Sequence, residues 1–292
     1  KYPEPNDVLS AITVLGNSNN SMRHITIRDN TIHDIVPGYA EAVAINGNVD
    51  TFEVRGNEVY DIANIGIVSA GNYRWVLQNY PNLLPANNQS RNGRITNNIV
   101  YRCLSPIAIS AGIYLDGSKN IRVDSNDCYH NGVGISVGNE QDSSVASGQL
   151  VHDNMLYENL GAGIYIGSNN PSSIVENSTI KWNTISHNYY IDPVLYSRTQ
   201  GRYGTLDSSG MWAEVVFNRA RNIIFEENEI TSGSDIVSAY LYGQTNLTLR
   251  YGGTRSDYQR INATMPSIWD YAEKAGFRSV YVDGQRTGGE TH

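Results

Sequence analysis

The stretch that decides the fold is residues 112–140, GIYLDGSKNIRVDSNDCYHNGVGISVGNE. It begins with GIYL at 112–115 and returns to the same pattern with GISV at 134–137. Between these two segments lie the alternating segment IRV at 121–123 and the sequence around Asn126. Apolar and polar residues alternate with a period of two in these segments. This alternation predicts short β-strands that each bury one face.

The asparagine of this stretch recurs along the chain in the same local context. Successive asparagines are 27, 41, 28, 28, 29 and 45 residues apart, so a unit of about 28 residues is lengthened twice by inserted loops. Such a unit cannot bury its own apolar face, whereas parallel units stacked about 4.8 Å apart can. We therefore predict an all-β fold, a right-handed parallel β-helix in which the asparagines form one structural column. The recurring residues are Asn30, Asn57, Asn98, Asn126, Asn154, Asn183 and Asn228.

The last fifty residues do not follow this repeat. We assign residues 1–241 to the β-helix and residues 242–292 to a short α/β tail or cap, a possible piece of another domain. In the tail, Ser267–Ala275 is expected to form a helix that Gly276 ends, followed by a strand at Ser279–Val282.

Composition narrows the classes of partner. The net charge of −8 disfavours nucleic acid, which needs a basic surface, and no apolar run is long enough to cross a membrane. The two cysteines, Cys103 and Cys128, form no metal-binding or disulfide pattern, and whether they pair is left open. Tyrosines outnumber phenylalanines by 20 to 4, which suits hydrated, sugar-like ligands. We expect an oligo- or polysaccharide partner and no metal or cofactor.

Two carboxylates are candidates for catalysis on the outer face of the stack. Aligning the repeats directs Asp116 outward, and Glu140 lies one coil and two residues further, at a Cα separation of roughly 8 Å. Two carboxylates at this range can share a glycosidic bond, and we predict Glu140 as the acid and an exposed, ionised Asp116 as its partner. The alternative is that both are turn residues.

Residues around this pair are candidates for binding substrate. They include aromatic side chains from the same strands and from the inserted loop at residues 73–92, which could instead pack as a lid on the coil wall. The predicted substrate-binding residues are Glu41, Asn46, Tyr73, Trp75, Tyr114, Lys119, Asn139 and Tyr165.

The asparagine-anchored coils and the strands quoted above resemble the pectate-lyase-like right-handed β-helix superfamily, over roughly residues 8–240. The segments that carry this resemblance are 41–48, 64–67, 112–117 and 134–140. Similar proteins often have an acid where this chain has Val68 and Ser136, whereas Glu41, Asp116 and Glu140 are retained. The resemblance implies a protein that handles carbohydrate, and lyase chemistry in this superfamily implies a basic residue, usually with Ca²⁺.

The final 45 or so residues are similar to a fragment of the sulfatase and phosphoethanolamine-transferase hydrolases. The metal-binding acid and nucleophile that such enzymes need are not found upstream, so we predict neither phosphatase nor sulfatase activity.

These observations favour a secreted or cell-surface bacterial protein that acts on carbohydrate, with a glycoside hydrolase as the first hypothesis. A non-catalytic carbohydrate-binding or adhesin-like β-helix is the second. A polysaccharide lyase or epimerase is the third, because lysines are scarce and no dense acidic cluster for Ca²⁺ is visible. The oligomeric state is left open.

Overall fold

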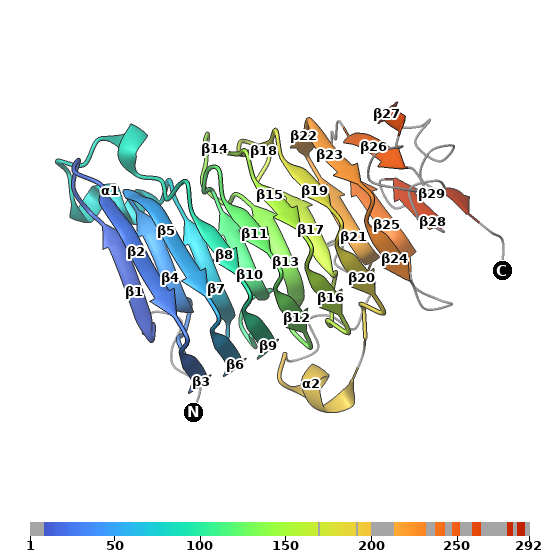
Figure 1. Ribbon diagram of the computed structural model, residues 1–292, viewed down its shortest axis with the longest axis horizontal. Helices are drawn as coiled ribbons and strands as arrows, with labels where there is room; N and C mark the ends of the chain where they lie inside the picture. The colour runs from blue at the N-terminus through green and yellow to red at the C-terminus, as the bar shows by residue number, and fades with distance from the viewer. Residues whose placement is uncertain are drawn as a thin grey trace.

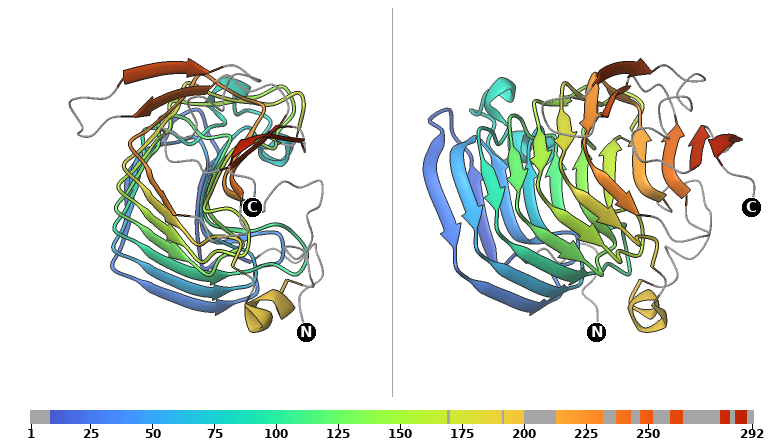
Figure 2. Two further views of the ribbon diagram at one scale, coloured as in Figure 1. Left: turned by 90° about the vertical axis from the view of Figure 1, so that its right-hand side faces the viewer. Right: turned by 45° about the vertical axis from the view of Figure 1, so that its right-hand side comes forward.

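The computed structural model describes residues 9–168, 170–190, 192–199 and 213–231, and the later segments 237–242, 247–251, 259–263, 279–282 and 285–289. The chain winds as a parallel β-helix, in which each coil adds one strand to each of three long sheets. Figure 1 shows the coils succeeding one another along the long axis, and the left view of Figure 2 looks along the stack. The predicted all-β parallel solenoid is confirmed.

The first sheet carries the candidate site on its outer face. Its strands pair in parallel throughout, apart from the last two, which are antiparallel. In spatial order they are β1 (Ile12–Gly16), β4 (Glu41–Gly47), β7 (Ile65–Ala70), β10 (Ala111–Asp116), β13 (Val133–Gly138), β17 (Ile164–Gly167), β21 (Ala213–Asn218), β25 (Val237–Tyr242), β28 (Ser279–Val282) and β29 (Gln285–Gly289).

The other sheets complete each coil. The second sheet contains β2 (Met22–Arg28), β5 (Val49–Arg55), β8 (Arg94–Thr96), β11 (Arg122–Asp124), β15 (Leu150–His152), β19 (Thr179–Lys181), β23 (Ile223–Glu226), β26 (Leu247–Tyr251) and β27 (Gln259–Ala263). The third contains β3 (Thr31–Ile35), β6 (Glu58–Ile62), β9 (Ile99–Cys103), β12 (Asp127–Tyr129), β16 (Met155–Tyr157), β20 (Thr184–Ser186) and β24 (Glu229–Thr231). A short sheet joins β14 (Val145–Ser147), β18 (Ile174–Glu176) and β22 (Ala220–Arg221).

Apolar side chains of successive coils stack inside the solenoid. Ile113, Ile135 and Ile164 are in register on neighbouring strands, and all three are fully buried. Cys103 and Cys128 are buried in the same core as free thiols. The inward face predicted from the alternation is confirmed.

The recurrent asparagines form the predicted column. Each Nδ2 donates to the Oδ1 of the asparagine one coil further, over 2.8–2.9 Å, from Asn30 through to Asn228. The same Oδ1 also accepts the backbone N–H of the preceding asparagine. Because one amide oxygen satisfies two donors at every step, the corner of each coil is fixed without a water molecule.

A second, shorter ladder was not predicted. It runs from Asn131 to Asn159 to Asn188, in which each backbone N–H donates to the next amide oxygen. The Nδ2 of Asn159 also donates to Oδ1 of Asn188. The ladder ends on Glu214, a buried carboxyl that accepts hydrogen bonds from the backbone and the side chain of Asn188. Burial raises the pKa of Glu214 to about 7, against the lowering effect of these hydrogen bonds.

Tyrosines of the third sheet stack on one another. The rings of Tyr60, Tyr101, Tyr129 and Tyr157 lie 4.9–5.1 Å apart and nearly parallel, and His33 extends the row. Since stacked rings cover each other's faces, these four tyrosines stabilise the sheet and are not free to stack on sugars. Part of the tyrosine content that suggested a sugar ligand is therefore structural.

Inserted loops account for the two long intervals. The first carries α1 (Arg74–Asn79) and the 3₁₀ helix Pro85–Asn87, and the second carries α2 (Pro193–Ser197), seen at opposite sides of the stack in Figure 1. The tail adds β26 and β28 to the second and first sheets by parallel pairing. The strand predicted at Ser279–Val282 is β28, while the helix predicted at Ser267–Ala275 lies outside the described residues. In the described part of the chain, no helix has the length and apolarity to span a membrane.

Candidate functional site

The outer face of the first sheet carries two neighbouring columns of residues, one through Tyr114 and one through Asp116. Tyr114 pairs with Ser136, which pairs with Tyr165, and Asp116 pairs with Gly138. Glu140 follows β13, and its backbone N–H donates to Oδ1 of Asp116 over 2.9 Å. The predicted pair is therefore brought into direct contact, through the backbone of one residue and the carboxylate of the other.

Asp116 differs from the prediction in its exposure. Its side chain is 0% exposed, because the Tyr73 hydroxyl, carried in by the inserted loop, donates to Oδ2 over 2.5 Å. Burial and the nearby Glu140 carboxylate raise the pKa of Asp116 to about 7, against the Tyr73 hydrogen bond that lowers it. The expectation of an open Asp116 is wrong, since the loop covers this carboxyl.

Glu140 and Glu41 are the carboxyl groups that reach the surface of the site. Glu140 is exposed and accepts a 3.0 Å hydrogen bond from the Tyr114 hydroxyl. Glu41, at the start of β4, is half-buried. Burial raises its pKa to about 8, and the charges of Asp116 and Glu140 act in the same direction. A carboxyl group that keeps its proton at neutral pH is a suitable general acid.

A pocket of about 530 Å³ brings these groups together. The first sheet forms its floor, and the insert after β7 covers it with Tyr73 and Trp75, which pack together at 6.2 Å between ring centroids. Trp75 is 41% exposed, so part of its ring faces solvent. The predicted residues that line this pocket are Glu41, Asn46, Tyr73, Trp75, Tyr114 and Glu140.

Two buried amide oxygens in this pocket have no hydrogen-bond donor. They are Oδ1 of Asn46 and Oδ1 of Asn64, and both residues line the pocket. Asn64 uses its Nδ2 to donate to the backbone carbonyl of Ala40, which leaves the oxygen as an acceptor. Asn64 was not predicted, because its sequence context shows only a strand start.

A second pocket of about 370 Å³ adjoins the first. Tyr114, Glu140 and Ile109 line both pockets, so they form the wall between them. The floor of the smaller pocket is built by β10, β13 and β17, with Ser136 in its middle.

Three predicted binding residues have other roles or positions. Asn139 lines the smaller pocket, but its buried amide holds the backbone of Ser144 and Ile174. Tyr165 also lines it, with a hydroxyl that accepts from Asn218. Lys119 lines neither pocket, because the chain turns at Gly117, where φ is +70°, toward the next sheet. The predicted closeness of Lys119 to the site is therefore wrong.

No metal site is found among the residues with described side chains. Within them, no group of three or more His, Cys, Asp and Glu side chains is arranged to hold an ion. No step is assigned to Ca²⁺ on this basis.

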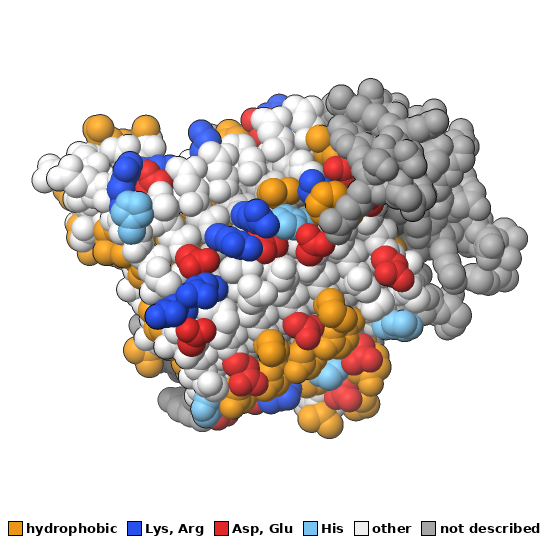
Figure 3. Space-filling model, in the orientation of Figure 1, with side chains coloured by type: hydrophobic (Ala, Val, Ile, Leu, Met, Phe, Trp, Pro, Cys, Tyr) orange, Lys and Arg blue, Asp and Glu red, His pale blue; other side chains and the backbone are white. Residues whose placement is uncertain are grey.

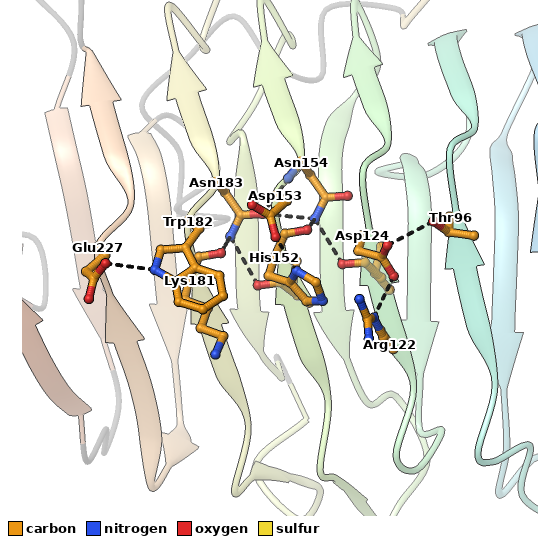
Figure 4. A network of polar contacts seen from close by, with 12 residues as sticks. Thr96, Arg122, Asp124, His152, Asp153, Asn154, Lys181, Trp182, Asn183 and Glu227 are labelled. Atoms are coloured by element: carbon orange, nitrogen blue, oxygen red, sulfur yellow. Dashed lines mark hydrogen bonds and ion pairs between the residues drawn. The ribbon is translucent and has the colours of Figure 1, made fainter. Parts of the chain in front are cut away.

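A second polar cluster lies on the second sheet and its corner (Figure 4). Although burial acts to raise it, hydrogen bonds from Arg94, Thr96 and Arg122 lower the pKa of Asp124 to about 2. Trp182 donates to Glu227, and the ammonium of Lys181 lies 3.9 Å from the centre of the Trp182 ring. These groups are engaged with one another, so they stabilise the sheet. The face in Figure 3 likewise mixes both signs of charge and has no basic block.

A family model described as the right handed beta helix region matches residues 10–201. The chain belongs to the right-handed β-helix family. The right-handed winding predicted from the sequence agrees with membership in this family. The family description names a fold and no activity.

Individual relatives of this β-helix protein are distant or partial. YwoF, an uncharacterized protein of Bacillus subtilis, is 33% identical over 148 residues, which are 48% of this chain and 30% of that protein. Among solved structures, the A-module of the Azotobacter vinelandii mannuronan C-5 epimerase AlgE6 has a TM-score of 0.49 at 12% identity, over 92% of this chain and 65% of that one. The enzymatically active domain of bacteriophage CBA120 tailspike protein 2 has a TM-score of 0.45 at 10% identity, over 85% of this chain and 34% of that one. The chain thus spans less than two thirds of these relatives, and the likeness to the solved structures concerns the fold alone.

Proposed function

We propose that this β-helix protein is a glycoside hydrolase whose active site is the larger pocket. The observation that carries the proposal is the joint presence of two carboxyl groups, Glu41 and Glu140, in the lining of one pocket. A carboxyl pair supplies acid and base for the cleavage of a glycosidic bond.

The roles of the two glutamates follow from their surroundings. Glu41, with its pKa raised to about 8, keeps a proton at neutral pH and gives it to the glycosidic oxygen as the bond to the anomeric carbon breaks. Glu140 is exposed, and the Tyr114 hydroxyl orients it. As a carboxylate, it takes a proton from the attacking water or attacks the anomeric carbon itself. This assignment exchanges the role first predicted for Glu140.

Asp116 acts as a positioning residue in this scheme. Its carboxyl accepts from the backbone N–H of Glu140 and from the Tyr73 hydroxyl, so it joins β10, β13 and the inserted loop. Because it is buried, it does not touch a sugar. Loss of this carboxyl should release the turn that carries Glu140.

A lyase or epimerase is supported less well. Such chemistry on a uronic acid needs a base and a positive charge that offsets the carboxylate of the substrate. Among the described residues that line the two pockets, none is Lys, Arg or His. A non-catalytic carbohydrate-binding protein is the second candidate, because aromatic rings and amide oxygens serve binding without turnover. A polymeric substrate supports a secreted or cell-surface location, which we also propose.

The test is a screen of wild type, Glu41→Gln and Glu140→Gln on neutral and uronic polysaccharides. New reducing ends report hydrolysis, and the ultraviolet absorbance of an unsaturated product reports a lyase. Each variant should lose about 10²–10⁴-fold of the hydrolytic rate, the usual contribution of an acid or base. The control is Glu229→Gln, an exposed carboxyl on the third sheet, which should retain the full rate.

The same screen separates the alternatives. Equal hydrolysis by wild type and both pocket variants would remove the site. An unsaturated product would identify a lyase, and binding without turnover would identify a binding protein.

A further inference from the structure

The insert after β7 is an Ω-loop whose two ends meet. The backbone N–H of Asn72 donates to the carbonyl of Asn88, so the loop of residues 73–87 begins and ends at one closed neck. Within this loop, α1 follows the neck, and Val76 and Leu83 are buried. A compact loop of this kind, closed at its neck, can move against the solenoid as one body.

Exposed contacts hold the outer side of this Ω-loop. Asn19, in the turn between β1 and β2, accepts a hydrogen bond from the backbone N–H of Leu84 and donates to the carbonyl of Asn82. Arg74 forms an ion pair with Asp142 over 3.0 Å, in which both side chains are more than half exposed. Because water competes for such groups, these contacts add little to the stability of the closed loop. The buried side of the loop therefore decides whether it stays closed.

The buried side of the Ω-loop lies against a cluster of three carboxyl groups. The Tyr73 hydroxyl donates to Asp116, which is fully buried, and Glu41 and Glu140 line the same pocket as Tyr73. Glu140 accepts in turn from the Tyr114 hydroxyl. The titratable side chains in the described lining of this pocket are Tyr39, Glu41, Tyr73, Tyr114 and Glu140. The charge on this carboxyl cluster therefore bears on the stability of the closed loop.

Closing of the Ω-loop is linked to protonation of the carboxyl cluster. Burial and the Glu140 charge raise the pKa of Asp116 to about 7, against the Tyr73 hydrogen bond that lowers it. Burial and the Asp116 charge raise the pKa of Glu41 to about 8. The ordinary values are 3.8 and 4.5, so the stabilisation of the closed form is fully present below these values and is lost as the pH rises through about 7 and about 8. Each pKa unit that the loop adds changes its closing equilibrium about tenfold.

We propose that the Ω-loop of residues 73–87 is a proton-linked cover of the larger pocket, which stays closed over Asp116 at acidic pH and opens as the carboxyl cluster ionises at alkaline pH. Opening removes the pocket wall that Tyr73 and Trp75 form. That this movement regulates hydrolysis rests on the proposed function. The movement itself needs no substrate, so it is tested without one.

The test is a buried cysteine that reports the opening. Ala70 is 0% exposed and belongs to the apolar cluster against which Tyr73 packs. Ala70→Cys places a thiol there, and a small reagent such as dithiodipyridine reaches it when the loop opens. Its reaction rate, divided by the rate in the unfolded protein at the same pH, gives the opening constant without the titration of the thiol. Ala44→Cys, in the same cluster, is a second reporter if Ala70→Cys does not fold.

The native thiols are the control for global unfolding. Cys103 and Cys128 are 0% exposed in the core, so they react when the solenoid unfolds. We expect the opening constant at residue 70 to exceed theirs about tenfold or more at every pH, and to rise about tenfold or more from pH 6 to pH 9. Glu41→Gln removes one linked group and should make this rise about threefold smaller or less, whereas Glu229→Gln, exposed on the third sheet, should leave it unchanged.

Three results would overturn the inference. They are an opening constant that is equal at pH 6 and pH 9, a rise that Glu41→Gln leaves unchanged, and labelling at residue 70 that is no faster than at the core thiols. None of these measurements depends on hydrolysis. Failure of the hydrolase would leave the loop movement supported, and a loop that stays closed would leave the hydrolase untouched.

Discussion

Glu214 offers a direct test of how the buried ladder is built. In the folded protein its pKa is raised to about 7 from an ordinary value of 4.5, so the buried carboxyl costs stability once it ionises. The contribution of the protonated Glu214 to the free energy of unfolding is fully present below pH 4.5 and is lost as the pH rises through about 7. At about 1.4 kcal/mol for each pKa unit, the loss amounts to about 3 kcal/mol.

Glu214→Gln removes the charge and can keep the contacts. Throughout the asparagine column one amide oxygen accepts both the N–H and the Nδ2–H of its neighbour, so a glutamine oxygen can do the same for Asn188. We expect the variant to be more stable than wild type by up to about 3 kcal/mol at pH 8 and about equal to it at pH 4. Glu41 and Asp116 also destabilise the fold as they ionise, but they are present in both proteins and cancel in the difference.

The assay is denaturant unfolding of both proteins at pH 4 and pH 8. Glu229→Gln is the control, because an exposed carboxyl should change the free energy of unfolding by less than about 0.5 kcal/mol at either pH. A stability difference between Glu214→Gln and wild type that is the same at both pH values would refute the reasoning. It would mean that the ladder does not end on a desolvated carboxyl.

Three further predictions concern the core, the column and the site. Ile135→Ala should lower the free energy of unfolding by about 2–5 kcal/mol through a cavity, and a loss well below 1 kcal/mol in denaturant unfolding would show that the side chain is not inside. Asn126→Ala should lower the free energy of unfolding by at least about 1–3 kcal/mol, because the buried donors of Asn98 lose their acceptor. Unchanged thermal unfolding would argue against the asparagine column. Tyr73→Phe should raise the pKa of Asp116 above about 7, because the hydroxyl no longer donates to the carboxylate. Carbon-detected NMR titration measures this pKa, and an unchanged or lower value would contradict the hydrogen bond from Tyr73 to Asp116.

The repeat in the sequence was sufficient to predict the fold, for a physical reason. Period-two alternation specifies which side chains enter the core, and an asparagine at each corner fixes the register between coils. From these two features the burial of Ile113, Ile135 and Ile164 and the outward position of Tyr114 followed directly.

The site was only partly predictable because it depends on the inserted loop. Tyr73 lies 43 residues before Asp116, and no repeat places it over that carboxyl. The Tyr73 side chain buries Asp116, which removes this residue from the catalytic pair and leaves Glu41 as the partner of Glu140. Asn64 opens segment 64–67, which carries the family resemblance, but nothing in that segment marks it as a residue of the pocket. Lys119 was misplaced because closeness in sequence ignores the turn at Gly117.

The most direct test of the central claim is the position of a bound sugar. Crystals of Glu140→Gln would be soaked with cellohexaose, xylohexaose and mannohexaose. We expect one of these sugar chains in the larger pocket over the first sheet, with a glycosidic oxygen within hydrogen-bond reach of Glu41. Sugar bound only elsewhere, for example along the tyrosine column of the third sheet, would contradict the account.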